Sequence, residues 1–305
     1  MATFTKIAKP SAHHDEVLYS GSDSNQTITG LGFQPDWLHI KNRNENGNHN
    51  IIDTVRGIDK IVYVNSTDGQ DTESKVSAIT SDGFTLVGNK PNTNDADDGF
   101  IAHCFKLAGS TTTNDASATG VGTIDSSYRA NTDSGISVVT WTGTGANGTI
   151  AHGLGRAPDC IIMKDISQDG YHWEFYMHSG NAGGSPENSA SSDEDHHIRF
   201  FDNDGTADPD DDHTYFNDTK PTSTVFSVGS KNNVNQSGIS FMAICIANTN
   251  GSVRAGAYQG NGKTHGSFIF TGFRPRAIWT KPGLTEDPHW KTVTTRFTSA
   301  TNAAA

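Results

Sequence analysis

One phrase occurs three times in this 305-residue chain, and it constrains the fold more than any other feature. It reads GLGFQPDWLHIK at 30–41, GLGRAPDCIIMK at 153–164 and TGFRPRAIWTK at 271–281. In each copy a glycine stands shortly before a proline, and a β-rich run ending in lysine follows. A proline just before a strand removes no hydrogen bond from the sheet. The phrase therefore predicts a tandem repeat whose units share the same opening strands.

The first two repeats also end alike. The runs SDGFTLVGNK and DGFIAHCFKLAG in the first repeat correspond to TSTVFSVGSK and SGISFMAICIANTNG in the second. Alternation of large and small apolar residues in these runs predicts a closing hairpin with one packed face. We therefore expect an all-β chain of tandem antiparallel β-sandwich repeats, jelly-roll-like, with the third repeat incomplete. The matched pairs are Phe84 with Phe226, Phe100 with Phe241, Ala102 with Ala243 and Cys104 with Cys245.

Composition agrees with short strands and many turns, since only 33% of residues are hydrophobic and 32 are glycine. The Ser/Thr-rich segment 110–135 is predicted to be a linker between the first two repeats, either flexible or an extended strap that lies on a neighbour. The predicted organisation is an N-terminal arm (1–14), repeat one (15–109), the linker (110–135), repeat two (136–250) with an acidic insertion (179–213), and a partial third repeat (251–305).

The third repeat has too few residues to close, because only about 33 follow Gly272. We expect either that the natural chain continues or that a neighbouring subunit supplies the missing strands. An unpaired sheet edge favours such pairing. The predicted assembly edge comprises Arg276, Ile278 and Thr280.

Charge and cysteine content exclude several classes of protein. A net charge of −12 argues against nucleic-acid binding. There is no apolar segment long enough for membrane insertion, and we predict no signal peptide. Cys104, Cys160 and Cys245 lie in apolar runs and are predicted to be buried, free thiols, which suits folding in a reducing cytoplasm.

The acidic insertion lengthens the second repeat by about 19 residues and is the one candidate metal-binding segment. A structural Ca²⁺ ion would use its carboxylates, although the spacing does not match an EF-hand. A solvated acidic loop is the favoured alternative, and zinc on the nearby histidines is the weakest. No other cofactor is predicted. The calcium candidates are Asp202, Asp204, Asp208, Asp210 and Asp212.

Catalytic motifs are absent from the sequence, including GxSxG, HExxH and GxxxxGK[ST], so we predict that the protein is not an enzyme. Carboxylate pairs of the kind that glycosidases need carry little weight in so acidic a chain. Trp173, with Tyr171 and Tyr176 in YHWEFYMH, is the candidate for a ring that faces a ligand such as a glycan. Packing of Trp173 in the core is the alternative.

The run WTGTG, the HGLGRAP phrase and the strand CIIMK, within 141–164, resemble a repeat of structural proteins of tailed bacteriophages. DTVRGIDKIVYVNSTDG at 53–69 is similar to a segment that follows the first strands in the same proteins. The resemblance covers the first two repeats and the opening of the third. It implies a non-enzymatic virion protein, assembled in the host cytoplasm, with no catalytic residues to carry over.

Within that class, a tail fibre or tail appendage that forms a homo-oligomer is the first expectation, with a trimer expected by analogy with phage fibres. Its partners would be itself and other virion proteins. A capsid decoration or head-fibre protein is the alternative within the class. A glycan-binding module that adsorbs the phage to its host surface is the alternative from another class.

Overall fold

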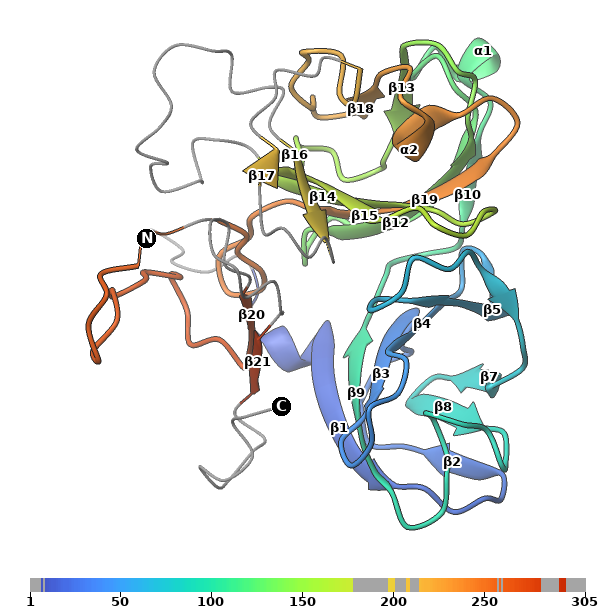
Figure 1. Ribbon diagram of the computed structural model, residues 1–305, viewed down its shortest axis with the longest axis vertical. Helices are drawn as coiled ribbons and strands as arrows, with labels where there is room; N and C mark the ends of the chain where they lie inside the picture. The colour runs from blue at the N-terminus through green and yellow to red at the C-terminus, as the bar shows by residue number, and fades with distance from the viewer. Residues whose placement is uncertain are drawn as a thin grey trace.

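The computed structural model describes residue 7 and residues 9–177, 197–200, 207–208, 214–256, 258, 260–280 and 291–294. The described chain is almost entirely β-structure, in antiparallel sheets, which confirms the predicted all-β sandwich fold. Two sandwiches lie one above the other, and a small hairpin stands beside the first strand of the lower one (Figure 1).

The first sandwich packs a six-stranded sheet against a three-stranded sheet. Its core contains Phe84 and Phe100, both fully buried. A short 3-10 helix, η1 (Pro10–Ala12), precedes the first strand. The larger sheet has the order β1 (His14–Ser20), β9 (Gly99–Phe105), β3 (Trp37–Asn42), β4 (Asn50–Asp53), β5 (Gly57–Tyr63) and β6 (Asp71–Thr72), and the smaller has β2 (Gln26–Ile28), β8 (Gly83–Leu86) and β7 (Val76–Thr80).

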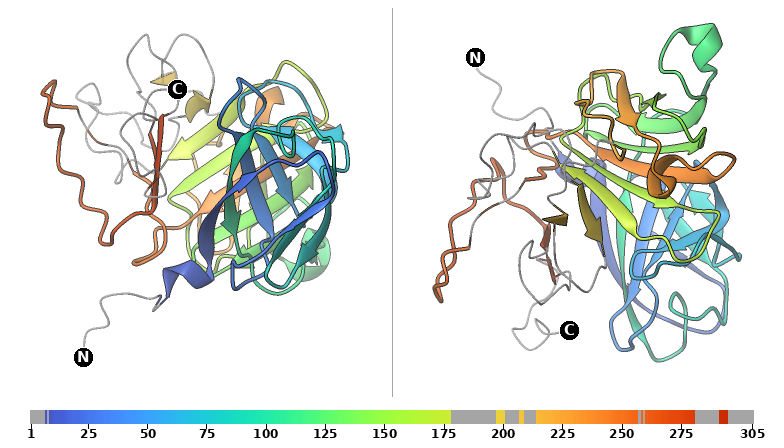
Figure 2. Two further views of the ribbon diagram at one scale, coloured as in Figure 1. Left: turned by 90° about the horizontal axis from the view of Figure 1, so that it is seen from below. Right: turned by 45° about the horizontal axis from the view of Figure 1, so that its top comes forward.

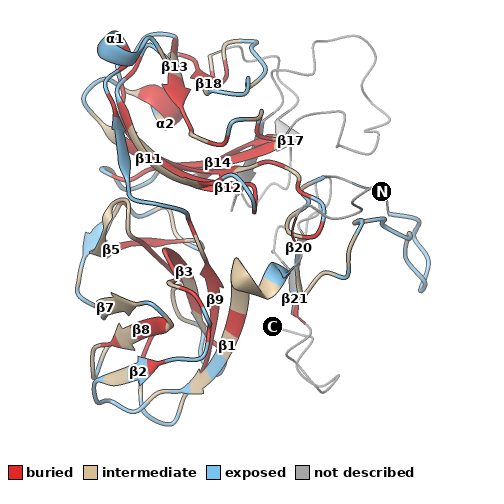
Figure 3. Cartoon of the chain, turned by 180° about the vertical axis from the view of Figure 1, so that it is seen from behind, coloured by how far each residue is buried: buried red, intermediate tan, exposed pale blue. Residues whose placement is uncertain are grey.

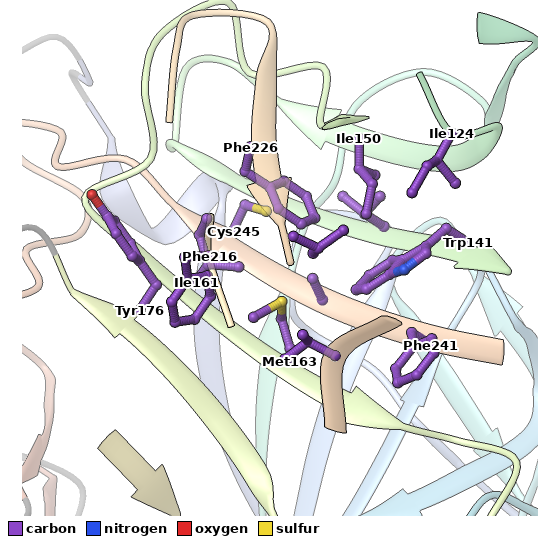
Figure 4. Packing of buried hydrophobic residues seen from close by; sticks show 14 of the residues in the cluster. Ile124, Trp141, Ile150, Ile161, Met163, Tyr176, Phe216, Phe226, Phe241 and Cys245 are labelled. Atoms are coloured by element: carbon purple, nitrogen blue, oxygen red, sulfur yellow. The ribbon is translucent and has the colours of Figure 1, made fainter. Parts of the chain in front are cut away.

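The second sandwich repeats this plan with an eight-stranded and a two-stranded sheet. Figure 4 shows its core, where the Trp141 ring packs against Phe226 and Phe241, and Met163 belongs to the same cluster. Two short helices, α1 (Ala116–Thr119) and α2 (Asn232–Asn235), flank the sheets. The larger sheet has the order β10 (Thr112–Asn114), β11 (Ser126–Asn131), β12 (Ile136–Thr142), β19 (Ser240–Ile246), β14 (Cys160–Asp165), β15 (Trp173–Met177), β16 (His197–Phe200) and β17 (Ala207–Asp208), and the smaller has β13 (Gly148–Ala151) and β18 (Val225–Val228).

The repeated phrase forms the same turn and strand in each repeat. Its glycine has a positive φ in all three copies, 72° at Gly32, 68° at Gly155 and 79° at Gly272. Glycine adopts this conformation without the steric cost that other residues meet, which explains its presence at that point of each phrase. The strands that follow are β3, β14 and β20 (Ala277–Thr280).

The predicted closing hairpin is wrong in its pairing. Strand β8 pairs with β2 and β7, whereas β9 pairs with β1 and β3, so the two lie in opposite sheets of the sandwich. Strands β18 and β19 are separated in the same way. The alternating residues were correctly placed in the core, but they face each other across it, because the chain crosses between sheets after β8 and after β18.

The predicted linker at 110–135 is also wrong. Strands β10 and β11 lie inside it and extend the larger sheet of the second sandwich through β12. Helix α1 lies there too, capped by the Asp115 carboxylate, which accepts a hydrogen bond from the Ala118 N–H. The small, polar residues of this segment give no apolar strand pattern, and only β10 lies at the edge of the sheet, where polar side chains are common.

The two larger sheets bury their outer faces against each other and form a third core between the sandwiches. Trp37 and Phe105 come from the first sandwich, and Ile162, Trp173 and Met242 come from the second. In Figure 3 the facing strands of both sandwiches are coloured as buried. The repeats are therefore joined as one packed body.

Polar contacts also join the two sandwiches at this interface. The Trp173 indole N–H donates to the Tyr63 carbonyl at 3.0 Å. The Arg129 guanidinium lies 2.8 Å from a carboxylate oxygen of Asp36, whose other oxygen accepts the N–H of Leu107. These contacts fix the two sandwiches in one relative position.

Candidate functional site at the third repeat

The third repeat consists, in its described part, of an extended segment followed by a two-stranded hairpin. Strand β20 pairs with β21 (Lys291–Thr294) in the register that β3 uses with β4 and β14 uses with β15. Ile278 therefore stands where Leu38 and Ile161 stand in the closed repeats. Among the residues that the structure describes, no strand pairs with the other edge of β20, where β9 and β19 pair in the closed repeats.

The outward face of this hairpin is apolar and exposed. Ile278 and its cross-strand partner Val293 are 44% and 61% exposed, whereas Leu38 and Ile161 are each 1% exposed in their own cores. The position that faces the sandwich core in the closed repeats thus faces outward in the third. An exposed apolar patch of this kind marks an interaction surface.

The segment before the hairpin adds more apolar surface. Phe268, Ile269 and Phe270 are 89%, 45% and 73% exposed. Phe268 lies four positions before Gly272, and β2 and β13, strands of the smaller sheets, end four positions before the phrase glycine of the first two repeats. Both views in Figure 2 show this orange-red segment leaving the two sandwiches. We call Phe268–Phe270, Ile278 and Val293 together the open face.

One residue of the repeated phrase differs in the third repeat, whose strand β20 has a strand on one edge only among the described residues. Asp36 and Asp159 each accept the backbone N–H that follows the closing strand, from Leu107 and Asn248 respectively. The third copy has Arg276 at this position. The third repeat therefore lacks the carboxylate that holds the closing strand in the other two.

Arg276 instead attaches the hairpin to the first sandwich, 2.8 Å from a carboxylate oxygen of Asp15 on β1. The opposite face of the hairpin packs on the same sheet. The Trp279 ring lies edge-on to His39 and His103, with centroids 5.6 and 5.5 Å away. The inward face of the hairpin is thus docked, while its outward face is the open face.

Beneath the hairpin, Glu16 on β1, His103 on β9 and His39 on β3 lie side by side in a row of polar side chains. His103 on β9 is paired directly with Glu16 on β1 and with His39 on β3. His103 stacks on His39 with centroids 5.5 Å apart. The Thr294 hydroxyl on β21 donates to Glu16 at 2.6 Å, which closes the row from above.

Burial changes the protonation of this row. It lowers the pKa of His14 to about 4, with the His103 charge acting in the same direction, and it holds the pKa of His39 well below its ordinary value. Burial by itself raises the pKa of Glu16, but the His103 ring and the Thr294 hydroxyl outweigh it, so that this pKa is lowered. The histidines with shifted pKa values are therefore neutral near pH 7 and Glu16 is ionised.

The three residues of the predicted assembly edge lie in different settings. Ile278 is exposed on the open face, but Arg276 is held by Asp15 and Thr280 is only partly buried beside its partner strand. The edge that sequence alone proposed is paired on one side by β21 of the same chain. The apolar open face, rather than the polar edge residues, is the main unsatisfied feature.

Two of the three predicted ligand-facing aromatic residues are buried. Trp173 and Tyr176 are each 1% exposed and pack on opposite faces of β15, so the prediction that they face a ligand is wrong for both. Tyr171 is partly buried, and its hydroxyl lies 3.4 Å from the Gln236 side-chain oxygen. Both faces of β15 are buried. One face lies in the core of the second sandwich, and the other packs against the first sandwich.

The acidic insertion gives no test of calcium binding. Asp202, Asp204, Asp210 and Asp212 lie outside the described residues, and Asp208 is described only as the end of β17. By contrast, all three cysteines are confirmed as buried, free thiols.

Sequence reasoning missed the group formed by His14, Glu16 and His103. One signal was present: HHDEV at 13–17 places a histidine and a glutamate two positions apart on one strand face. The third member lies far along the chain, and only the pairing of β1 with β9 brings it close.

A family model described as Domain of unknown function (DUF7483) matches residues 9–304. The chain belongs to the DUF7483 family. The match extends from the strands of the first sandwich past the hairpin of the third repeat, so the open repeat belongs to the family domain. No curated protein and no solved structure matches the chain significantly. None of the helices in the described residues is both long and apolar enough to cross a bilayer.

Proposed function

We propose that this chain is a non-enzymatic structural protein of a bacteriophage virion, in the first instance a tail fibre or tail appendage component that assembles as a homo-oligomer. The observation that carries the assembly proposal is the open face, where apolar positions that are buried in two repeats are exposed in the third. The virion assignment is supported by the resemblance of the repeated phrase to that of phage structural proteins.

Assembly through the open face has a direct physical reason. Phe268, Phe270 and Val293 are more than half exposed, and burying apolar area stabilises association by about 25 cal/mol per Å². In a trimer with threefold symmetry, the open faces of three copies can meet around the axis and cover one another. A trimer remains the expected state.

Sedimentation velocity over a range of protein concentrations tests the assembly. We expect an oligomer for the wild-type chain and a monomer for the double variant Ile278→Asp, Val293→Asp, whose side chains point away from the folded hairpin. Leu18→Asp is the matched control, since Leu18 is a 39% exposed apolar residue on β1 of the first sandwich, and it should leave the oligomer intact. A monomeric wild-type chain at all concentrations, or an oligomeric double variant, would refute assembly through the open face.

Mass spectrometry of gradient-purified phage particles, with immunogold electron microscopy, tests the virion assignment. Label on the tail supports a fibre or appendage. Label on the capsid favours the decoration or head-fibre alternative. Absence of the chain from the particle contradicts the proposal as a whole.

A further inference from the structure

The strongest feature that assembly does not account for is the group of polar side chains under the hairpin. Strands β1 and β9 are antiparallel neighbours, with Glu16 directly opposite His103. His14 lies two residues before Glu16, so both side chains project from the same face of β1. Three residues that can ligate a metal are therefore gathered on one sheet face.

The ligand atoms converge. One ring nitrogen of His14, one of His103 and one carboxylate oxygen of Glu16 all lie within 4.8 Å of one another. His103 Nδ1 and Glu16 Oε1 are 3.1 Å apart. Two ligands of a tetrahedral Zn²⁺ ion stand about 3.3 Å apart, given bonds of about 2.0–2.1 Å. The pair is thus already close to metal-ligand spacing.

Hydrogen bonding leaves an atom of each of the same three side chains unsatisfied. Glu16 and His103 are 1% and 2% exposed, yet Glu16 Oε1, His103 Nδ1 and His14 Nε2 make no hydrogen bond. The only contact between these two atoms is the ion pair of His103 Nδ1 with Glu16 Oε1. Buried polar atoms without a partner cost about 1–3 kcal/mol each. A cation bound between them would give the carboxylate oxygen and the imidazole nitrogens a common partner.

We propose that His14, Glu16 and His103 form a binding site for a divalent transition-metal ion, for which Zn²⁺ is the best chemical match. Two imidazoles and one carboxylate are ligands that zinc accepts, and a three-ligand set leaves one position for water. Calcium is a poorer match, because it takes six to eight oxygen ligands.

Surrounding residues complete the site. The Thr294 hydroxyl donates to Glu16 Oε2 at 2.6 Å, which orients the carboxylate and leaves Oε1 for the metal. Phe105 packs on the His14 ring with centroids 4.5 Å apart, and Trp279 covers His103 edge-on. Because Thr294 and Trp279 belong to the hairpin, the metal would strengthen the attachment of the third repeat to the first sandwich.

Metal binding to the full-length chain tests this site. After removal of metal with EDTA, Zn²⁺ is titrated by calorimetry, and Co²⁺ is added separately to report coordination geometry by its visible absorption. We expect one Zn²⁺ per chain, a tetrahedral Co²⁺ spectrum, and a rise in Tm of about 5 °C at hundred-fold excess over Kd. His14→Gln and Glu16→Gln should each weaken Zn²⁺ binding at least ten-fold. His49→Gln is the control, since His49 is near His39 but outside the group.

Each result of these titrations counts for or against the site. Loss of binding in His14→Gln and Glu16→Gln, with binding kept in His49→Gln, supports the site. Zinc that binds equally well to all three variants lies elsewhere, for example on the histidines of the acidic insertion, and overturns the proposal. A folded wild-type chain that takes up neither ion overturns it as well, and the group is then an ion pair only. If one of the two variants fails to fold, Zn²⁺ binding to the other decides.

Discussion

Replacing Trp173 tests the claim that the two sandwiches are joined as one packed body. The indole is 1% exposed in the core between the larger sheets, and its N–H donates to the Tyr63 carbonyl of the other sandwich. A buried tryptophan removes about 150–250 Å² from water, which corresponds to about 4–6 kcal/mol at 25 cal/mol per Å². Measured Trp→Ala losses of about 3–5 kcal/mol lie in the same range. We therefore expect Trp173→Ala to cost about 4 kcal/mol.

This prediction also says which interface loses stability. Trp173→Ala removes packing between sandwiches, so urea unfolding should separate into two transitions once the repeats no longer stabilise each other. Trp173→Phe keeps most of the ring packing but leaves the Tyr63 carbonyl without its donor, and should cost about 1–3 kcal/mol. Phe241→Ala is the control, because Phe241 is fully buried in the core of the second sandwich alone.

Urea denaturation followed by circular dichroism and by tryptophan fluorescence measures these effects. The two probes should coincide for the wild-type chain and diverge for Trp173→Ala. Phe241→Ala should lower the stability of the second sandwich by a comparable amount without removing the contact with the first. A Trp173→Ala chain whose single transition is displaced by less than about 1 kcal/mol would refute a packed interface and leave two independent repeats.

Two further predictions concern the second sandwich. Burial lowers the pKa of His152 to about 4, and its neutral ring accepts the Leu154 N–H and contacts the Thr222 carbonyl, so the unfolded chain binds more protons between pH 6.5 and 4. Stability from this group is full above pH 6.5 and falls by about 3 kcal/mol on acidification to pH 4, whereas His152→Asn should flatten that slope in urea titrations; an unchanged slope contradicts the assignment. Gly153 has a φ of 73°, and an added Cβ would lie 2.2 Å from the Tyr128 ring, so Gly153→Ala should lower thermal stability by more than about 2 kcal/mol. Gly155→Ala, with a φ of 68° and open space, should cost only about 1–2 kcal/mol, and equal losses in calorimetry would show that the ring contact is unimportant.

Repetition made much of the fold predictable. The phrase around each glycine fixes a turn with positive φ and the strand after it, and these depend on residues close together in the chain. Alternation in 99–105 and 240–246 correctly placed Phe100 and Phe241 in cores, because side chains alternate strictly along a strand. Pairing was not predictable in the same way. Strands adjacent in sequence lie in opposite sheets here, and local pattern carries no signal for that crossing.

The candidate sites show the same division. The third copy of the phrase and its Ile278 are visible in the sequence, since this copy can be aligned with the other two. The burial of Trp173 was decided by the second sheet that covers β15, and the meeting of Glu16 with His103 by pairing across 87 positions. Sequence determined which residues share a strand face, because backbone geometry is local. Tertiary structure alone decided what each face meets, because burial and ligand geometry depend on strands that are distant in the chain.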